Sequence, residues 1–289
     1  MTEGGSKKGI ALITGADGGM GRIHTRALAK EGYDVVMACY DTEVARPVRD
    51  AICKETGSNI HLMQVDLADL QSVVRFCDDF KSQFPTLNIL LNNAGVLSSK
   101  CKTSANNVEY TVAVNYLGHY TLTNLLRPVM VNGTRIVSMI SIAYYLGRIK
   151  PDFFTPKTPR KYNRFFSYGN SKLALYYFML DASEAWKNDG ITFNVADPDI
   201  VSTNIIRLDN AVADKLCDWF FRPFINTPEQ GAASMIAAAL NPEFATTTGK
   251  IIKKCKIAEH NRKFYDNVAA RTLLRDMTQE LLHKNNITL

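Results

Sequence analysis

Short apolar runs alternate with helically patterned segments along the whole of this sequence. The runs are bounded by glycine, proline or polar residues, which is typical of strands buried within a sheet. Strands are expected at Gly9–Thr14, Tyr33–Tyr40, Ile60–Val65, Leu87–Leu91, Thr134–Ile140, Ile191–Ala196 and Gly249–Ile252. Because helical segments separate them, the pattern predicts a parallel sheet with helices on both faces, joined by right-handed crossovers.

The helices expected between these strands have apolar positions three and four residues apart. They include Leu70–Phe84, Val108–Leu126, a long helix that contains Tyr168, Pro228–Leu240 and Phe264–His283. No linker, repeat or low-complexity segment divides the chain, so we expect a single Rossmann-type, doubly wound α/β domain over residues 1–289. An apolar and aromatic segment at about 204–226 either covers a substrate at the sheet edge or packs on a partner subunit.

Composition and charge are those of an ordinary globular protein and argue against several other classes. Charged residues make up 21% of the chain and the net charge is +6, without a long basic run, so nucleic acid is not an expected partner. The six cysteines have no regular spacing and the five histidines form no cluster, which argues against disulfides and a metal site. No apolar stretch has the length of a leader or a membrane span, so we expect a cytoplasmic protein.

A glycine-rich turn follows the first strand and opens the first helix. Its sequence, from residue 14 to residue 21, is TGADGGMG. Glycines in this position let the backbone approach the pyrophosphate of a dinucleotide at the positive end of the helix, although a plain left-handed turn is the alternative. The candidate cofactor-binding residues of the turn are Gly15, Asp17, Gly19, Met20 and Gly21.

Further candidate residues follow the next three strands. They are Tyr40, Asp66, Leu67, Asn93, Ala94 and Gly95. Tyr40 ends the second strand, where an acidic residue would bind ribose hydroxyls and a basic one would favour a 2′-phosphate. Asp66 either accepts from the adenine amino group or caps the next helix. The segment from Asn93 suits close backbone packing beside a cofactor, with a simple loop as the alternative.

Tyr168 and Lys172 are expected on one face of a helix, about 5–6 Å apart at Cβ. An ammonium group stabilises a neighbouring phenolate, so the pKa of the tyrosine should fall toward neutrality, as a general acid or base requires. The spacing is common by chance, and a solvated lysine beside a packed tyrosine is the alternative. Ser141 is expected at the carboxyl end of the fifth strand, where catalytic groups gather. Asn115 either bends its helix and feeds a proton path or is a hydrogen-bonded core amide.

Taken together, these motifs resemble those of the short-chain dehydrogenase/reductase family. The resemblance covers nearly the whole chain and includes the glycine turn, NNAG at residues 92–95 and Tyr-x-x-x-Lys at residues 168–172. It is most similar to the retinol-dehydrogenase-like branch, through the segments RIVSMIS, NYLGHYTLTNLL, YGNSKLA, TPEQGA and TGKIIKKCK.

The resemblance implies an NAD(P)-dependent oxidoreductase that moves hydride between the nicotinamide and a carbon bearing oxygen, without a metal. Tyr168 would be the general acid/base, and Lys172 would lower its pKa and hold the nicotinamide ribose. Ser141 would bind the substrate oxygen, and Asn115 would anchor a water in the proton relay. The other implied cofactor contacts are the glycine turn, Asp66, Asn93, Pro198 and, at the carboxamide, Thr203.

Three positions depart from the family pattern. Cys39 stands where an acid favours NAD, and Tyr40 stands where the NADP-using branch has arginine. We therefore favour NADP(H) over NAD(H), with help from Arg46 or Arg22, while Tyr40 flanking the adenine is the alternative. Asp199 replaces a glycine that lets the backbone approach the nicotinamide, so its side chain and charge are expected to crowd that end. The third departure, Ile140 in place of a serine before Ser141, should matter less.

Two functions are compatible with these residues. The first is an enzyme that interconverts an alcohol and a carbonyl on an apolar small molecule. The second is a catalytically weak dinucleotide-binding sensor or interaction protein, motivated by Asp199 and the missing ribose determinant. The intact Asn115, Ser141, Tyr168 and Lys172 favour the enzyme. Because family members often pair through the tyrosine-bearing helix, a homodimer or homotetramer is expected.

Overall fold

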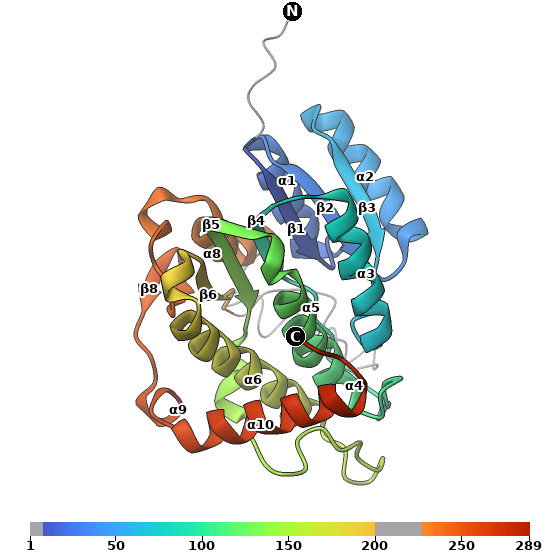
Figure 1. The fold of residues 1–289 in the computed structure, drawn as a ribbon, viewed down its shortest axis with the longest axis vertical. Helices are drawn as coiled ribbons and strands as arrows, with labels where there is room; N and C mark the ends of the chain where they lie inside the picture. The colour runs from blue at the N-terminus through green and yellow to red at the C-terminus, as the bar shows by residue number, and fades with distance from the viewer. Residues whose placement is uncertain (1–7, 200–226) are drawn as a thin grey trace, which may run out of the picture.

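A single sheet organises the described part of the chain. The computed structural model describes residues 8–199 and 227–289, and within them eight strands follow the order β3-β2-β1-β4-β5-β6-β7-β8 (Figure 1). The strands are β1 (Ile10–Thr14), β2 (Asp34–Cys39), β3 (Ile60–Gln64), β4 (Leu87–Asn92), β5 (Met130–Met139), β6 (Thr192–Asp197), β7 (Ile251–Lys253) and β8 (Lys256–Ala258). Every neighbouring pair from β3 to β7 is parallel. The Rossmann-type fold expected from the sequence is confirmed.

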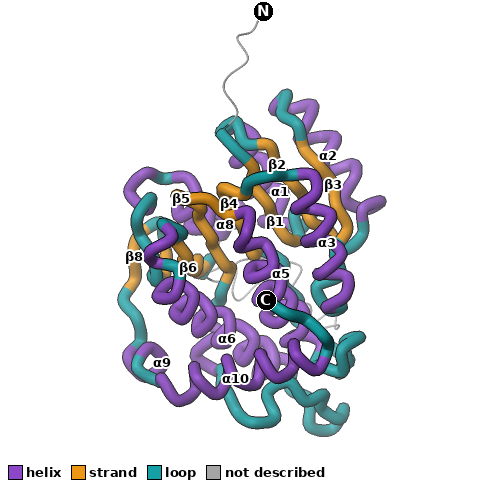
Figure 2. The backbone as a smooth tube through the Cα atoms, viewed as in Figure 1, coloured by secondary structure: helices purple, strands orange, loops and turns teal. Residues whose placement is uncertain are grey.

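Two layers of helices cover the two faces of this sheet (Figures 1 and 2). One layer contains α1 (Gly19–Lys30), α2 (Thr42–Thr56) and α8 (Pro228–Leu240). The other contains α3 (Leu70–Gln83), α4 (Tyr110–Val112), α5 (His119–Leu126) and α6 (Arg164–Ala185), with α10 (Val268–Lys284) outside them. Short apolar strands are buried on both faces, so Leu12 and Ile13 of β1 enter opposite cores.

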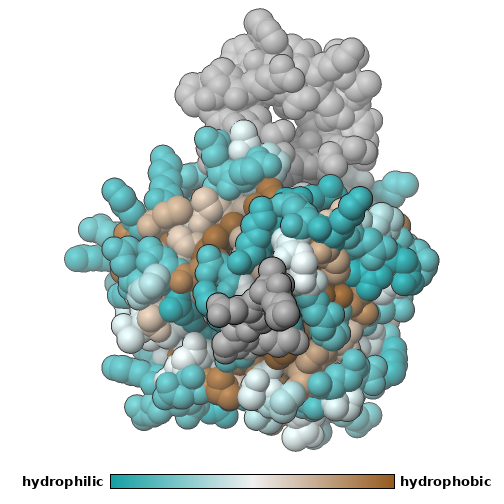
Figure 3. Space-filling view, turned by 90° about the horizontal axis from the view of Figure 1, so that it is seen from above, coloured by the Kyte–Doolittle hydropathy of each residue, from teal (hydrophilic) through white to brown (hydrophobic). Residues whose placement is uncertain are grey.

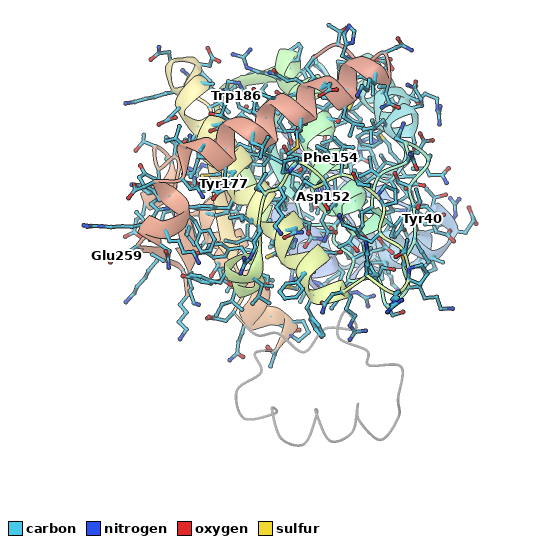
Figure 4. The ribbon with its side chains drawn as sticks, turned by 90° about the horizontal axis from the view of Figure 1, so that it is seen from below. Tyr40, Asp152, Phe154, Tyr177, Trp186 and Glu259 are labelled. Atoms are coloured by element: carbon cyan, nitrogen blue, oxygen red, sulfur yellow. The ribbon has the colours of Figure 1, made fainter. Side chains whose placement is uncertain are left out.

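The helix α6 is deeply buried because it lies between the sheet and α10 (Figures 1 and 4). Fourteen of its 22 residues are buried, which explains why its apolar residues show little one-sided periodicity. The helix α10 is fixed across this layer by polar contacts. The hydroxyl groups of Tyr116 and Thr278 are 2.9 Å apart, and Arg271 reaches two acidic side chains of α6.

Two details of the expected secondary structure are wrong. The last strand, expected at Gly249–Ile252, is instead the first arm of an antiparallel hairpin of β7 and β8. Its turn uses Lys254 and Cys255, both with positive φ (50° and 56°), in place of the glycine or asparagine that usually marks such a turn. The helix expected over Val108–Leu126 is divided by a π-helical segment, η1 (Ala113–Gly118).

The visible surface is mostly hydrophilic when the described residues are seen from above (Figure 3). Among residues 8–199 and 227–289, no helix combines the length and the hydropathy needed to cross a bilayer. The segment at about 204–226, which we expected to cover the substrate, lies outside the described residues, as does Thr203.

Replacing Arg271 with alanine should lower the free energy of unfolding by about 1–3 kcal/mol. Its side chain is 13% exposed and donates to Asp181 Oδ1 at 2.8 Å and Glu184 Oε2 at 3.1 Å, so the variant removes the donor from the partly buried Asp181 carboxylate and the packing of the Arg271 side chain itself. The matched control is Arg275→Ala on the same helix, where the side chain is 47% exposed. Urea unfolding would measure both, and equal losses would contradict the docking role of Arg271.

Candidate active site

The glycine turn brings backbone atoms closer together than a side chain would permit. Gly15 has φ +59° and its N–H donates to Ala38 O of β2 at 2.8 Å. A Cβ atom at Gly21 would stand 2.1 Å from Gly15 O, whereas one at Gly19 would meet no atom within 4 Å. The N-cap residue Gly18 supplies no side-chain hydrogen bond to α1, and the first turn carries no acidic residue. The turn therefore fits an anion such as a pyrophosphate at the helix N-terminus.

The segment after β4 is tied directly to this turn. Asn93 Nδ2 donates to Thr14 O at 2.9 Å and to Gly15 O at 3.1 Å. The backbone N–H groups of Asn93 and Ala94 both donate to Thr14 Oγ1 at 3.0 Å. The same hydroxyl lies 2.9 Å from Nε2 of buried His119. Asn93 and Ala94 thus border the glycine turn as expected, while Thr14 and His119 are site residues that our sequence reasoning missed.

Asn115 lies inside the π-helical segment, in a buried position. Its Oδ1 accepts from Val96 N at 2.8 Å, and its Nδ2 donates to Val96 O at 2.9 Å and to Ser171 Oγ at 3.0 Å. His119 Nδ1 lies 3.0 Å from the main-chain oxygen of Asn115. The helix is locally distorted at Asn115, as the first interpretation of this residue from the sequence requires. Its side-chain amide is also hydrogen-bonded in the core, as the second interpretation requires. π-Helical segments of this kind often occur at functional sites.

Gly95 completes the contact between this segment and α6. A Cβ atom added at Gly95 would lie 3.5 Å from Lys172 Nζ and 3.6 Å from Asn115 Oδ1. The residue therefore stands between the amide of the π-helical segment and the ammonium group of α6. Both distances are ordinary van der Waals contacts, so a Cβ atom would fit here, and the narrow gap limits only larger side chains.

Ser141, Tyr168 and Lys172 come together at the carboxyl end of β5. Ser141 caps the short helix η3 (Ile142–Leu146), accepting from Ala143 N at 3.3 Å, and its side chain lies near enough to Tyr168 to lower the pKa of that phenol. Lys172 is buried, donates from Nζ to Met139 O at 2.7 Å, and lies 5.5 Å from the centre of the Tyr168 ring. The expected catalytic side chains thus share one end of the sheet.

The electrostatics of this group differ from our expectation. Burial raises the pKa of Tyr168 to about 12, the hydrogen bond from Ser141 lowers it only in part, and the charge of Asp197 raises it further. Burial also lowers the pKa of Lys172 to about 7. The expected lowering of the tyrosine pKa by the lysine is therefore wrong for the protein chain by itself. The ammonium group faces the ring and a backbone carbonyl, and desolvation outweighs its charge.

The adenosine side of the site lies at the ends of β2 and β3. Tyr40 is 68% exposed and stands at the periphery of the molecule (Figure 4). Cys39 is buried with the Asp17 carboxylate against its thiol. Burial raises the pKa of that thiol to about 12, and the charge of Asp17 contributes. Asp17 of the glycine turn therefore supplies a carboxylate beside the strand end that lacks one of its own.

Asp66 and Leu67 have mainly local contacts. Asp66 Oδ1 accepts from Ala68 N at 2.8 Å, while Asp69 is the N-cap of α3, so the capping alternative for Asp66 is wrong. Leu67 is buried, and its carbonyl oxygen would stand 2.4 Å from a Cβ atom at Gly118. The side chain of Leu67 therefore packs in the helix layer, and any contact with a cofactor would come from its backbone.

The end of β6 carries a charged cluster. Asp199, next to Pro198, has φ +60°, and its Oδ1 is 2.6 Å from Lys253 Nζ. Buried Asp197 lies 3.4 Å from the same ammonium group. The carboxylate expected to crowd the site is therefore engaged by a cation of β7, which the sequence pattern did not indicate.

Comparisons with known proteins show the family to which this chain is related. The model of the short chain dehydrogenase family matches residues 9–152. Mouse retinol dehydrogenase 14 is 32% identical over 94% of this chain and 86% of its own length. Human retinol dehydrogenase 11 is 31% identical over 94% of this chain and 85% of its own length. Mouse polyprenol dehydrogenase is 33% identical over 84% of this chain and 75% of its own length.

Solved structures show the same fold. A short chain dehydrogenase from Burkholderia cenocepacia J2315 in complex with NADP has a TM-score of 0.67 and 24% identity, over 86% of this chain and 96% of its own. The structure of an uncharacterized protein from Mycobacterium paratuberculosis has a TM-score of 0.74 and 24% identity. The match covers 95% of this chain and 93% of that protein.

The chain belongs to the short-chain dehydrogenase/reductase family, in its retinol-dehydrogenase-like branch. It is an NAD(P)-dependent dehydrogenase/reductase that interconverts alcohols and carbonyls. Within the residues that the structure describes, no group of three or more histidine, cysteine or acidic side chains could hold a metal ion.

Gly21→Ala and Gly19→Ala should have opposite effects on folding. The added methyl group at Gly21 would overlap Gly15 O, so the free energy of unfolding should fall by about 2 kcal/mol or more. At Gly19 the space is open and the residue lies in a helix, so stability should stay the same or rise by up to about 1 kcal/mol. Urea unfolding of both variants tests the close approach, and a stable Gly21→Ala protein would refute it.

Proposed function

We propose that this enzyme acts on apolar small-molecule alcohols and carbonyls, with Tyr168 as the general acid/base. The observation that carries the proposal is the grouping of Ser141, Tyr168 and buried Lys172 at the carboxyl end of β5, where the side chain of Ser141 acts on the phenol of Tyr168. A substrate oxygen at this position would meet both hydroxyl groups, which suits proton transfer coupled to a change at the adjacent carbon.

The glycine turn and the segment from Asn93 to Gly95 are the residues that would hold the dinucleotide. Its pyrophosphate would lie at the N-terminus of α1, and Lys172 would reach the nicotinamide ribose. When bound, the nicotinamide supplies or accepts the hydride. Tyr168 moves the proton, Ser141 orients the substrate oxygen, and Asn115 holds the Gly95–Val96 segment in place beside Lys172.

The apolar character of the substrate is supported by the relatives. Two of these relatives are named for retinol and one is named for polyprenol. Retinol and polyprenol are both long isoprenoid alcohols. We therefore propose an apolar alcohol or its carbonyl form as the substrate class, which turnover of a panel graded by chain length would test. The cytoplasmic location expected from the sequence stays a prediction, for which cell fractionation is the test.

A second function is supported by the pKa values at the site. Because the pKa of Tyr168 is raised to about 12 and that of Lys172 is lowered to about 7, the protein chain alone favours neither the phenolate nor a permanent ammonium beside it. A raised pKa for the tyrosine and a lowered pKa for the lysine are compatible with a weakly active dinucleotide-binding sensor. Tyr168-dependent turnover decides between the two functions.

The expected pairing through α6 has to accommodate α10. Arg271 of α10 contacts Asp181 and Glu184 of α6, so part of the outer surface of α6 is covered by this chain itself (Figure 4). We propose that a homodimer or homotetramer, if formed through this layer, uses the amino-terminal part of α6, where Phe165 and Phe166 are 47% and 53% exposed. Sedimentation of a Phe165→Ser/Phe166→Ser variant would test this surface.

We favour NADP(H) over NAD(H) because of Arg22. Its Nη2 donates to Asp17 O at 3.0 Å, so the guanidinium group lies over the glycine turn. Arg46, the other candidate, is 2.6 Å from Glu43 Oε1 and already paired. The carboxylate of Asp17 beside Cys39 acts in the opposite direction, because it would repel a 2′-phosphate.

Asp17→Asn should therefore raise the ratio of NADP⁺ to NAD⁺ affinity by roughly tenfold, since a negative charge near the phosphate is removed. Arg22→Gln should lower the same ratio, and Arg46→Gln serves as the matched control. Titration of each variant with both dinucleotides measures the ratio. Equal ratios in all three variants would show that neither Asp17 nor Arg22 faces the phosphate.

Tyr168→Phe should reduce kcat by about 10²- to 10⁴-fold, because the proton carrier is lost. The affinity for the dinucleotide should change little. The control is Tyr177→Phe on the same helix (Figure 4), whose buried hydroxyl has no hydrogen-bond partner among the described residues, and it should retain activity. Turnover that survives in Tyr168→Phe would remove the general acid/base role and favour the sensor.

A further inference from the structure

Two acidic side chains at the carboxyl end of β6 and one lysine at the end of the neighbouring strand β7 are not used by the proposed reaction. Asp199 Oδ1 lies 2.6 Å from Lys253 Nζ, and Asp197 Oδ2 lies 3.4 Å from it. Asp199 N also donates to Asp197 Oδ1 at 3.0 Å. We call Asp197, Asp199 and Lys253 the β6 charge cluster.

The backbone of the cluster is held in an unusual conformation. Asp199 has φ +60°, in the left-handed region that aspartate and asparagine adopt more readily than most residues. The backbone hydrogen bond to Asp197 and the ion pair with Lys253 both stabilise this conformation. As a result, the Asp199 carboxylate points to β7.

The cluster has an excess of negative charge. Two carboxylates face one ammonium group, so the formal sum is one negative charge when all three groups are ionised. Burial is the largest single influence and would lower the pKa of Lys253, but the hydrogen bonds and charges of Asp199 and Asp197 together outweigh it and the pKa is raised, so this lysine stays charged. Burial raises the pKa of Asp197, and the charge of Lys253 partly offsets that rise.

The position of the cluster places this charge next to the reaction centre. β6 pairs with β5 in the register Met139↔Ala196, so Asp197 follows directly beside the strand end that leads to Ser141. The charge of Asp197 acts on Tyr168 and also on Tyr144 of η3. The cationic group on the other side is Lys172, which is buried under Tyr168.

The topology indicates which half of a dinucleotide lies here. In a doubly wound sheet the dinucleotide crosses the edge at the switch point, which in this sheet lies between β1 and β4. The adenosine half extends over β2, so the nicotinamide half extends over β4, β5 and β6. A nicotinamide ring that exchanges hydride with a carbon at Tyr168 must lie close to the end of β6.

We propose that the β6 charge cluster makes this enzyme select the oxidised dinucleotide over the reduced one, and so biases it toward alcohol oxidation. The inference rests on the proposed site. The nicotinamide ring carries a positive charge when oxidised and none when reduced. A net negative charge nearby, in a partly desolvated position, therefore stabilises the oxidised form more. Lys253 limits this effect and keeps two adjacent carboxylates from repelling each other.

The test is the ratio of the dissociation constants for NADPH and NADP⁺, measured by fluorescence titration and competition, with NADH and NAD⁺ as a second pair. Asp199→Asn keeps a residue that tolerates positive φ and removes one charge, so the preference for the oxidised form should fall roughly tenfold. Lys253→Met should shift the ratio by a similar factor in the opposite direction. The control is Lys256→Met, an exposed lysine paired with Lys253 across the same hairpin, which should leave the ratio unchanged.

The outcomes separate this inference from the proposed function. Opposite shifts in Asp199→Asn and Lys253→Met support the inference. Binding of both forms with the same ratio in wild type and Asp199→Asn overturns it and leaves the proposed function intact. Failure of the wild-type protein to bind any of the four dinucleotides overturns both. Asp199→Asn decides the question even where Lys253→Met does not fold.

Discussion

The hydroxyl group of Thr14 is the contact on which the geometry of the site depends. It accepts the N–H groups of Asn93 and Ala94 and lies against His119, so it joins the end of β1 to β4 and α5. From His119 the hydrogen bonds continue through Asn115 to Ser171, which donates to Tyr168 O at 2.7 Å. Leaving such buried polar groups without partners is costly, so the network fixes the glycine turn and the tyrosine helix relative to each other.

Burial also sets the electrostatic character of the site. The same packing that positions Tyr168 and Lys172 removes them from water, which raises the pKa of the phenol and lowers that of the amine. Tyr168 is thus held as a neutral phenol by the protein, while the pKa of Lys172 lies close to neutral pH. Fixed charges that remain nearby, above all the β6 charge cluster, consequently act with little screening on whatever binds between them.

Sequence reasoning anticipated the fold and the grouping of the site residues, because alternating strands and helices leave few arrangements. The carboxyl ends of parallel strands meet at one edge, which is why Ser141 and the NNAG segment converge, and Tyr168 reaches the same edge from α6. Prediction from the sequence failed where residues far apart along the chain form a contact that leaves no local sequence pattern. Lys253 is one of several lysines in its segment, and only the pairing of β6 with β7 brings it to Asp197 and Asp199. The β7–β8 turn was missed because Lys254 and Cys255 are not typical turn residues.

The sequence by itself determined the family and the doubly wound sheet, since these follow from periodicity and from motifs of fixed spacing. Only the tertiary structure decided the environment of each side chain. Desolvation depends on every element packed around a group, so neither the raised pKa of Tyr168 nor the lowered pKa of Lys172 could follow from their four-residue spacing. The same reason applies to Asp199, whose charge is directed to Lys253 by a neighbouring strand that lies far along the chain.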